Sequence, residues 1–139
     1  MIERDFIMRM LQMFFEALAK LIEKKDVPGE EPDPSYIQER LYGMYEQFFH
    51  TPAIHFYHLS KEDMLDELLS NNYSERDILA RVQMLSELLY QDAMVKNSTL
   101  EKYGLLEKSL YLFEYLNHHS NTFSWDRNQR ILDIKKILT

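Results

Sequence analysis

Residues 2–25 read IERDFIMRMLQMFFEALAKLIEKK and carry the clearest helical pattern in the chain. Apolar side chains recur here at intervals of three and four, which places them on one face of a helix; they are Ile7, Leu11, Phe14, Leu18 and Leu21. A second apolar stripe runs beside the first and consists of Phe6, Met10, Met13 and Ala17. The stretch therefore predicts a long amphipathic helix whose apolar face is wider than one partner helix needs.

The rest of the chain repeats this helical pattern. Glycine and proline are rare, with three and four residues, and no apolar–polar alternation predicts a strand. Residues with N-cap chemistry precede the apolar periodic segments; they are Ser35 (with Gln38), Ser60 (with Asp63), Ser74 (with Asp77), Thr99 and Ser124. We therefore expect an all-α antiparallel bundle of about five long helices, with one or two short helices within 51–70.

A single helical domain is expected over residues 1–139. It divides into a long N-terminal helix (1–25), an acidic, proline-containing loop (26–34) and helical hairpins (35–139). The last helix is expected to bury Trp125 together with Ile131, Leu138 and either Ile134 or Leu132. Gly43 and Gly104 fall inside helices, and close packing against a neighbouring helix is the usual compensation for their low helix propensity.

Composition excludes several classes of function. The 139 residues include 16 Lys and Arg against 23 Asp and Glu, so the formal net charge is −7. Nucleic acids and anionic membranes need a basic surface, and we expect neither as a partner. Cysteine is absent, which excludes disulfides, thiolate catalysis and thiolate-bound metals. Charged residues interrupt every long apolar run, so we expect no signal peptide, no membrane span and a cytoplasmic location.

Two resemblances extend this interpretation. The opening Arg4-Asp5-Phe6-Ile7-Met8-Arg9, the middle Leu59-Ser-Lys-Glu-Asp-Met-Leu65 and the closing Leu116-Asn-His-His-Ser-Asn-Thr-Phe-Ser124 make the chain similar to a family of small bacterial helical proteins. That family has no established activity, so the similarity implies a helical fold and no catalytic residues. Ser109, Phe113 and Leu116 also have a spacing that resembles the second helix of a tetratricopeptide-like hairpin, which implies protein binding.

Candidate metal ligands lie within nine residues of one another. His50, His55 and His58 have imidazole side chains, and His55 and His58 share a face if the segment is helical. Carboxylates follow closely in the sequence, at Glu62, Asp63 and Asp66. The alternative is that these histidines lie near helix ends at the surface, which is the interpretation we prefer. A metal- or small-ligand-binding helical protein is the second functional hypothesis.

Motifs of other reaction classes are missing from the sequence. There is no Glu-x-x-His pair for a di-iron site, no Gly-x-Ser-x-Gly turn and no glycine-rich phosphate loop. We therefore expect no enzymatic activity and no cofactor.

The first functional hypothesis is a non-enzymatic module for protein interaction or self-association. Its expected face consists of Phe6, Met10, Met13 and Phe14, with a homodimer through the N-terminal helix as one outcome. The nine tyrosines are expected mostly at the boundary of the core, and an aromatic-lined groove for a peptide or ligand is the alternative.

Overall fold

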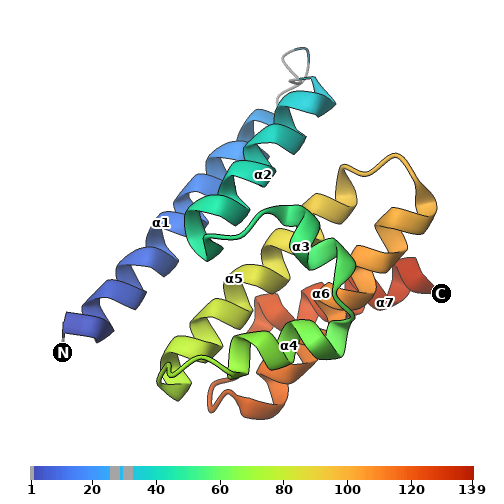
Figure 1. Ribbon diagram of the computed structural model, residues 1–139. Coiled ribbons are helices and arrows are strands. Elements are labelled where there is room, and N and C mark those ends of the chain that lie inside the picture. The colour runs from blue at the N-terminus through green and yellow to red at the C-terminus, as the bar shows by residue number, and fades with distance from the viewer. Residues whose placement is uncertain (1, 26–28, 30–32) are drawn as a thin grey trace.

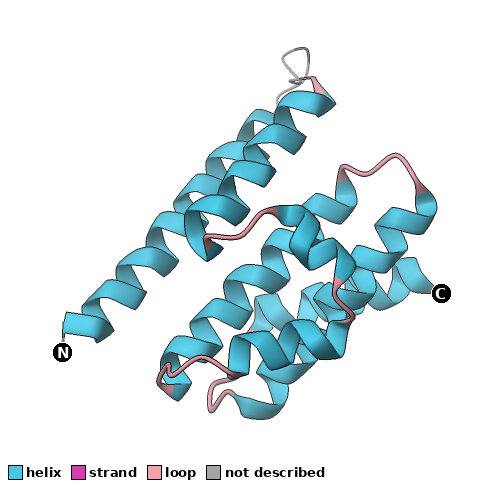
Figure 2. Ribbon diagram, viewed as in Figure 1, coloured by secondary structure: helices cyan, strands magenta, loops and turns pink. Residues whose placement is uncertain are grey.

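The structure is a computed structural model that describes residues 2–25, 29 and 33–139. In this part of the chain every regular element is an α-helix, as Figure 2 shows. The helices are α1 (Ile2–Lys25), α2 (Pro34–Phe49), α3 (Ala53–His58), α4 (Lys61–Leu69), α5 (Glu75–Met94), α6 (Thr99–His119) and α7 (Trp125–Leu138). The all-α prediction is confirmed. Most of the expected 26–34 loop lies outside the described residues.

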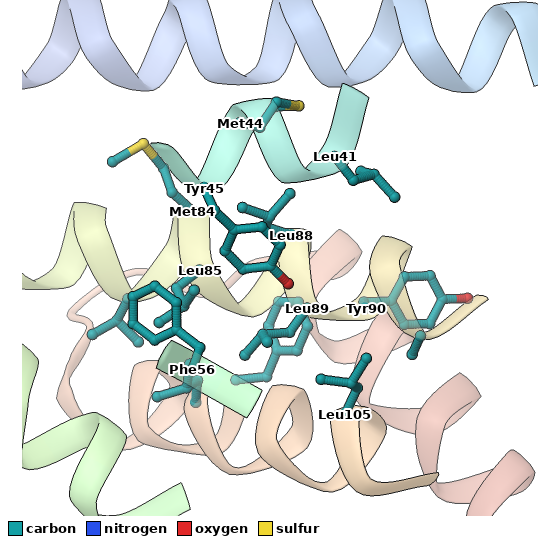
Figure 3. Close-up of a cluster of buried hydrophobic side chains, with 14 of the residues drawn as sticks. Leu41, Met44, Tyr45, Phe56, Met84, Leu85, Leu88, Leu89, Tyr90 and Leu105 are labelled. Atoms are coloured by element: carbon teal, nitrogen blue, oxygen red, sulfur yellow. The ribbon is translucent and has the colours of Figure 1, made fainter. Parts of the chain in front are cut away.

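Helix α5 lies at the centre of the arrangement and packs against α1, α2, α4 and α6 (Figure 1). Ten of its twenty residues are buried, so apolar side chains point in almost every direction around the helix axis. A helix that is apolar on all sides is stable only when other elements surround it. Figure 3 shows part of this core, in which the Tyr45 ring of α2 points toward α5 and lies near Leu88 and Leu89.

Helices α5 and α6 form the most extensive helix pair, and two small polar residues lie in their contact. Ser86 and Ser109 are both fully buried, and the Ser109 hydroxyl donates to the Ser86 carbonyl oxygen at 2.7 Å. The Ser86 hydroxyl donates to the Gln83 carbonyl oxygen of its own helix at 2.9 Å. Both hydroxyls are therefore satisfied without water, and the small side chains leave room for close helix packing.

The helix starts follow the predicted caps at three positions out of five. The hydroxyls of Ser60, Ser74 and Ser124 accept from the backbone N–H three residues later. Two predictions were wrong by one or two residues. Asp33, not Ser35, caps α2, because Pro34 occupies the first helical position and Asp33 Oδ1 accepts from the Ser35 N–H at 3.0 Å. Ser98, not Thr99, caps α6.

The last helix differs from expectation on one face. Ile131 is buried as predicted, and of the two alternatives Ile134 is buried while Leu132 is 61% exposed. Trp125, in contrast, is 73% exposed, and Leu138 is only partly buried. The Ser124 cap starts α7 at Trp125. At about 100° per residue, nine residues from Trp125 to Ile134 place the two side chains on opposite sides of the helix. Trp125 therefore points away from the core that Ile134 enters.

Candidate functional site

A buried carboxylate is the most unusual polar group in the described structure. Asp92 lies on α5 with no exposed surface, three and four residues after the core leucines Leu89 and Leu88. Its Oδ1 accepts from Gln38 Nε2 at 2.8 Å, and its Oδ2 accepts from the Tyr45 hydroxyl at 2.7 Å. The Tyr57 hydroxyl also donates to Oδ2. Both carboxylate oxygens are therefore fully engaged inside the protein.

Lys96, just after α5, balances the charge of Asp92. Its Nζ lies 3.4 Å from Asp92 Oδ1 and donates to Gln38 Oε1 at 2.8 Å. The same ammonium group lies 4.8 Å from the centre of the Tyr57 ring, within the range of a cation–π contact. A buried ion pair is tolerated when further hydrogen bonds satisfy both partners, as they do here. The Asp92 network, as we name Gln38, Tyr45, Tyr57, Asp92 and Lys96, thus joins α2, α3 and α5.

The two tyrosines of this network are held in their protonated form. Burial, followed by the nearby Asp92 carboxylate, raises the pKa of Tyr45 well above its ordinary value of 10. Burial and the hydrogen bond to Asp92 raise the pKa of Tyr57 in the same direction. Each hydroxyl thus remains a donor to Asp92. The geometry fixes three helices relative to one another and presents no free carboxylate oxygen to a substrate.

Sequence reasoning missed the Asp92 network, although one signal was present. Asp92 follows Leu85, Leu88 and Leu89 at helical spacing, so it occupies a position on the apolar face of α5. A charged residue on such a face needs partners inside the fold. The partners themselves, Gln38 and Tyr57, lie 54 and 35 residues earlier, beyond the reach of a local pattern.

The three candidate metal ligands have different environments, and their side chains do not come together. His50 is exposed and ends α2 in the left-handed conformation, with φ of 54°. The His55 ring lies beside Glu67, with 2.7 Å between Nε2 and Oε1, and His58 is exposed at the end of α3. Throughout the described residues, no three His, Cys, Asp or Glu side chains come together in a way that could hold a metal ion. The metal hypothesis therefore has no supporting geometry.

Lys108 of α6 explains how the short helix α3 is held. Its Nζ donates to the carbonyl oxygens of Phe56 and Tyr57 at 3.0 and 2.8 Å, in the last turn of α3. Partial burial lowers the pKa of Lys108 below its ordinary value. The ammonium group satisfies carbonyls that a helix C-terminus leaves without intrahelical partners.

The expected interaction face on α1 is partly exposed. Phe6 is 58% exposed and Met13 is 49% exposed, while Met10 is half-buried against the core. Phe14 does not belong to this face, which corrects the prediction. Its ring is fully buried and lies edge-on to Phe48 of α2, with 5.2 Å between ring centres. Phe14 is 100° away from Met13 around the helix, so it belongs to the core stripe with Ile7 and Leu18.

A groove continues this face along the contact between α1 and α2. Its volume is about 820 Å³, and Met13, Ala17, Gly43 and Met44 contribute to its lining. Charged side chains of both helices also line it, among them Glu16, Lys20, Glu39 and Arg40. Helix α2 has 16 residues and is shorter than α1, which has 24. Figure 1 shows that α2 lies beside only the C-terminal part of α1. The N-terminal part of α1, which carries Phe6, extends beyond the end of α2.

The helical glycines do not make the close contacts that the sequence predicted. A Cβ atom built on Gly43 or Gly104 meets no atom within 4 Å, and both residues are exposed. Close packing against another helix is therefore wrong as an explanation within the described chain. Gly43 differs from Gly104 in one respect, since it lines the groove between α1 and α2.

Comparisons with models of protein families, with curated proteins and with solved structures found no match. The resemblances to a bacterial helical family and to tetratricopeptide-like hairpins gain no support from them. Among the described residues, no helix combines the length and apolarity that crossing a membrane requires.

Proposed function

We propose that this protein is a non-enzymatic helical module that binds another protein, or a second copy of itself, through the exposed apolar side of α1. One observation carries the proposal: Phe6 and Met13 keep about half of their surface exposed, directly beside the side of α1 that packs into the core. Large exposed apolar side chains beside a groove are typical of protein-binding surfaces. Methionine suits such a surface because its flexible side chain adapts to a partner.

Position-specific crosslinking tests this proposal. A photoreactive amino acid replaces Met13, and the matched control carries it at Leu132, which is 61% exposed on α7. We expect crosslinked products from position 13, either to a second copy or to one defined protein of the native cell, and a much lower yield from position 132.

Surface variants provide the complementary test. Phe6→Gln and Met13→Gln keep helix propensity while removing apolar surface, so both variants should fold and lose the interaction. If crosslinking at position 13 is no stronger than at position 132, or if the Gln variants associate as the wild type does, α1 is not the binding surface.

A further inference from the structure

The exposed side of α1 follows the spacing of a helix-pairing seam. Phe6, Met10, Met13 and Ala17 are separated by four, three and four residues, the alternation that places side chains along one contact line between two helices. We name these four residues the α1 seam. Its N-terminal end carries the large Phe6 ring, and its C-terminal end carries the small Ala17 in the groove between α1 and α2. The seam thus combines a protruding end and a recessed end on one helix.

We propose that a second copy of this chain occupies the groove, with the two α1 helices antiparallel about a twofold axis near residues 11 and 12. This inference rests on the proposed function and names its partner. In this register residue i of one copy lies opposite residue 23 − i of the other, so that Phe6 of each copy packs over Ala17 of the other. Met10 then meets Met13 in both halves of the contact. A twofold interface requires such self-complementarity; here the large Phe6 meets the small Ala17 at each end, and the flexible methionines meet each other in the middle.

The charged residues beside the seam agree with the same register. Arg9 and Glu16 each precede a seam residue and are both exposed, on the side of the seam away from Phe14. In an antiparallel pair, flanking residues of this kind face their counterparts on the second helix. The register above brings Arg9 of each copy beside Glu16 of the other and forms two symmetrical ion pairs.

Gly43 supplies an independent observation in favour of this occupant. It lies inside α2, where glycine is unfavourable, and no atom of the described residues lies within 4 Å of the position that a Cβ atom would take. It lines the same groove as Ala17, so its missing side chain leaves space where the Phe6 ring of a second copy arrives. Gly104 has the same open surroundings on α6 but lies outside this groove. The two glycines therefore form a matched pair for an experiment.

Charge exchange tests the register. Molar mass is measured by light scattering over a range of concentrations for the wild type, Arg9→Glu, Glu16→Arg and the double variant. We expect a wild-type dimer and a dissociation constant that rises about tenfold or more in each single variant, since each places like charges together twice. The double variant restores opposite charges and the net charge of the wild type, so its dissociation constant should return close to the wild-type value. Circular dichroism of each variant verifies that the helices form.

A large side chain at position 43 tests whether the Phe6 ring of a second copy occupies the groove. Gly43→Arg should weaken the dimer by about tenfold or more because the new side chain occupies the place of Phe6, whereas Gly104→Arg should leave it unchanged. Arginine is a better helix former than glycine, so both variants should fold.

The remaining outcomes would each overturn the inference in a recognisable way. A dimer that none of these variants weakens uses another surface. Single variants that weaken the dimer without rescue by the double variant contradict the antiparallel register. A wild type that stays monomeric while position 13 crosslinks to a different protein refutes the second copy as occupant and leaves the proposed function standing.

Discussion

Replacing Asp92 by alanine should cost this protein a large part of its stability. The substitution removes the acceptor of two tyrosine hydroxyls and one glutamine amide, and it leaves Lys96 without its counter-ion. The Lys96 side chain is only 10% exposed, and Tyr45 is fully buried. Removing one partner of a buried ion pair typically costs about 3–5 kcal/mol, which is a large share of the roughly 5–15 kcal/mol that stabilises a domain.

Urea unfolding followed by circular dichroism measures this loss. We expect Asp92→Ala to lower the free energy of unfolding by about 3–5 kcal/mol and the melting temperature by about 10–20 °C. Asp66→Ala is the matched control, because Asp66 is exposed on α4, and it should change stability by less than about 0.5 kcal/mol.

A double-mutant cycle with Tyr45→Phe separates two contributions to the loss of unfolding free energy: the hydrogen bonds of Asp92, and the cavity that the Asp92→Ala substitution leaves. In the wild type, loss of the Tyr45 hydroxyl removes a hydrogen bond to a charged group and should cost about 1.5–3 kcal/mol. In the Asp92→Ala background the same change removes an unpaired buried hydroxyl and should cost almost nothing. Equal costs in both backgrounds, or an Asp92→Ala loss below about 1 kcal/mol, would refute the reasoning.

Three further predictions concern pH and the helix ends. The folded state raises the pKa of Tyr45 and Tyr57, so it keeps protons that the unfolded chain loses above about pH 10. The free energy of unfolding should therefore fall by about 1.4 kcal/mol per pH unit for the buried Tyr45, and by less for the half-buried Tyr57, whose interactions solvent screens. Urea titrations between neutral and strongly alkaline pH measure this slope, which Tyr45→Phe should reduce; an unchanged slope would contradict the assignment. His50 has a φ of 54°, so His50→Val should cost about 1–2 kcal/mol and His50→Gly should be neutral or stabilising by about 0.5 kcal/mol. Thermal melts of the two variants decide this, and equal effects would argue against a left-handed helix end. Lys108→Met removes two hydrogen bonds at the end of α3 and should speed amide exchange there more than in α4, with a stability loss of about 1–2 kcal/mol. Uniform acceleration in both helices would show that Lys108 does not act on α3 in particular.

Local patterns predicted the helices well because the residues that determine a helix lie within it or directly before it. Apolar residues spaced by three and four identified the core stripe of α1, including Ile7 and Leu18. A serine followed three positions later by an aspartate identified the starts of α4 and α5. These features depend on residues within one or two turns. The shift of the α2 cap to Asp33 is also local and could have been predicted from Pro34 at the first helical position.

The Asp92 network could not be predicted in the same way because it is assembled from distant segments. Tyr45 and Asp92 are 47 residues apart, and Lys96 reaches Gln38 across 58 residues. Sequence spacing could single out Asp92 as a charge on an apolar face, but not its donors. Which tyrosines turn inward depends on how α2 and α3 pack against α5. The exposure of Phe6 and Met13 likewise depends on where α2 ends relative to α1.

The contact between Lys108 and α3 has a consequence for how the chain folds during synthesis. A helix of six residues does not persist by itself in water, since nucleation costs more than so few hydrogen bonds return. The carbonyl of Phe56 is satisfied by a residue that is synthesised 52 positions later. The α3 segment therefore leaves the ribosome well before its anchor, and it is expected to become a stable helix only after α6 has emerged and docked.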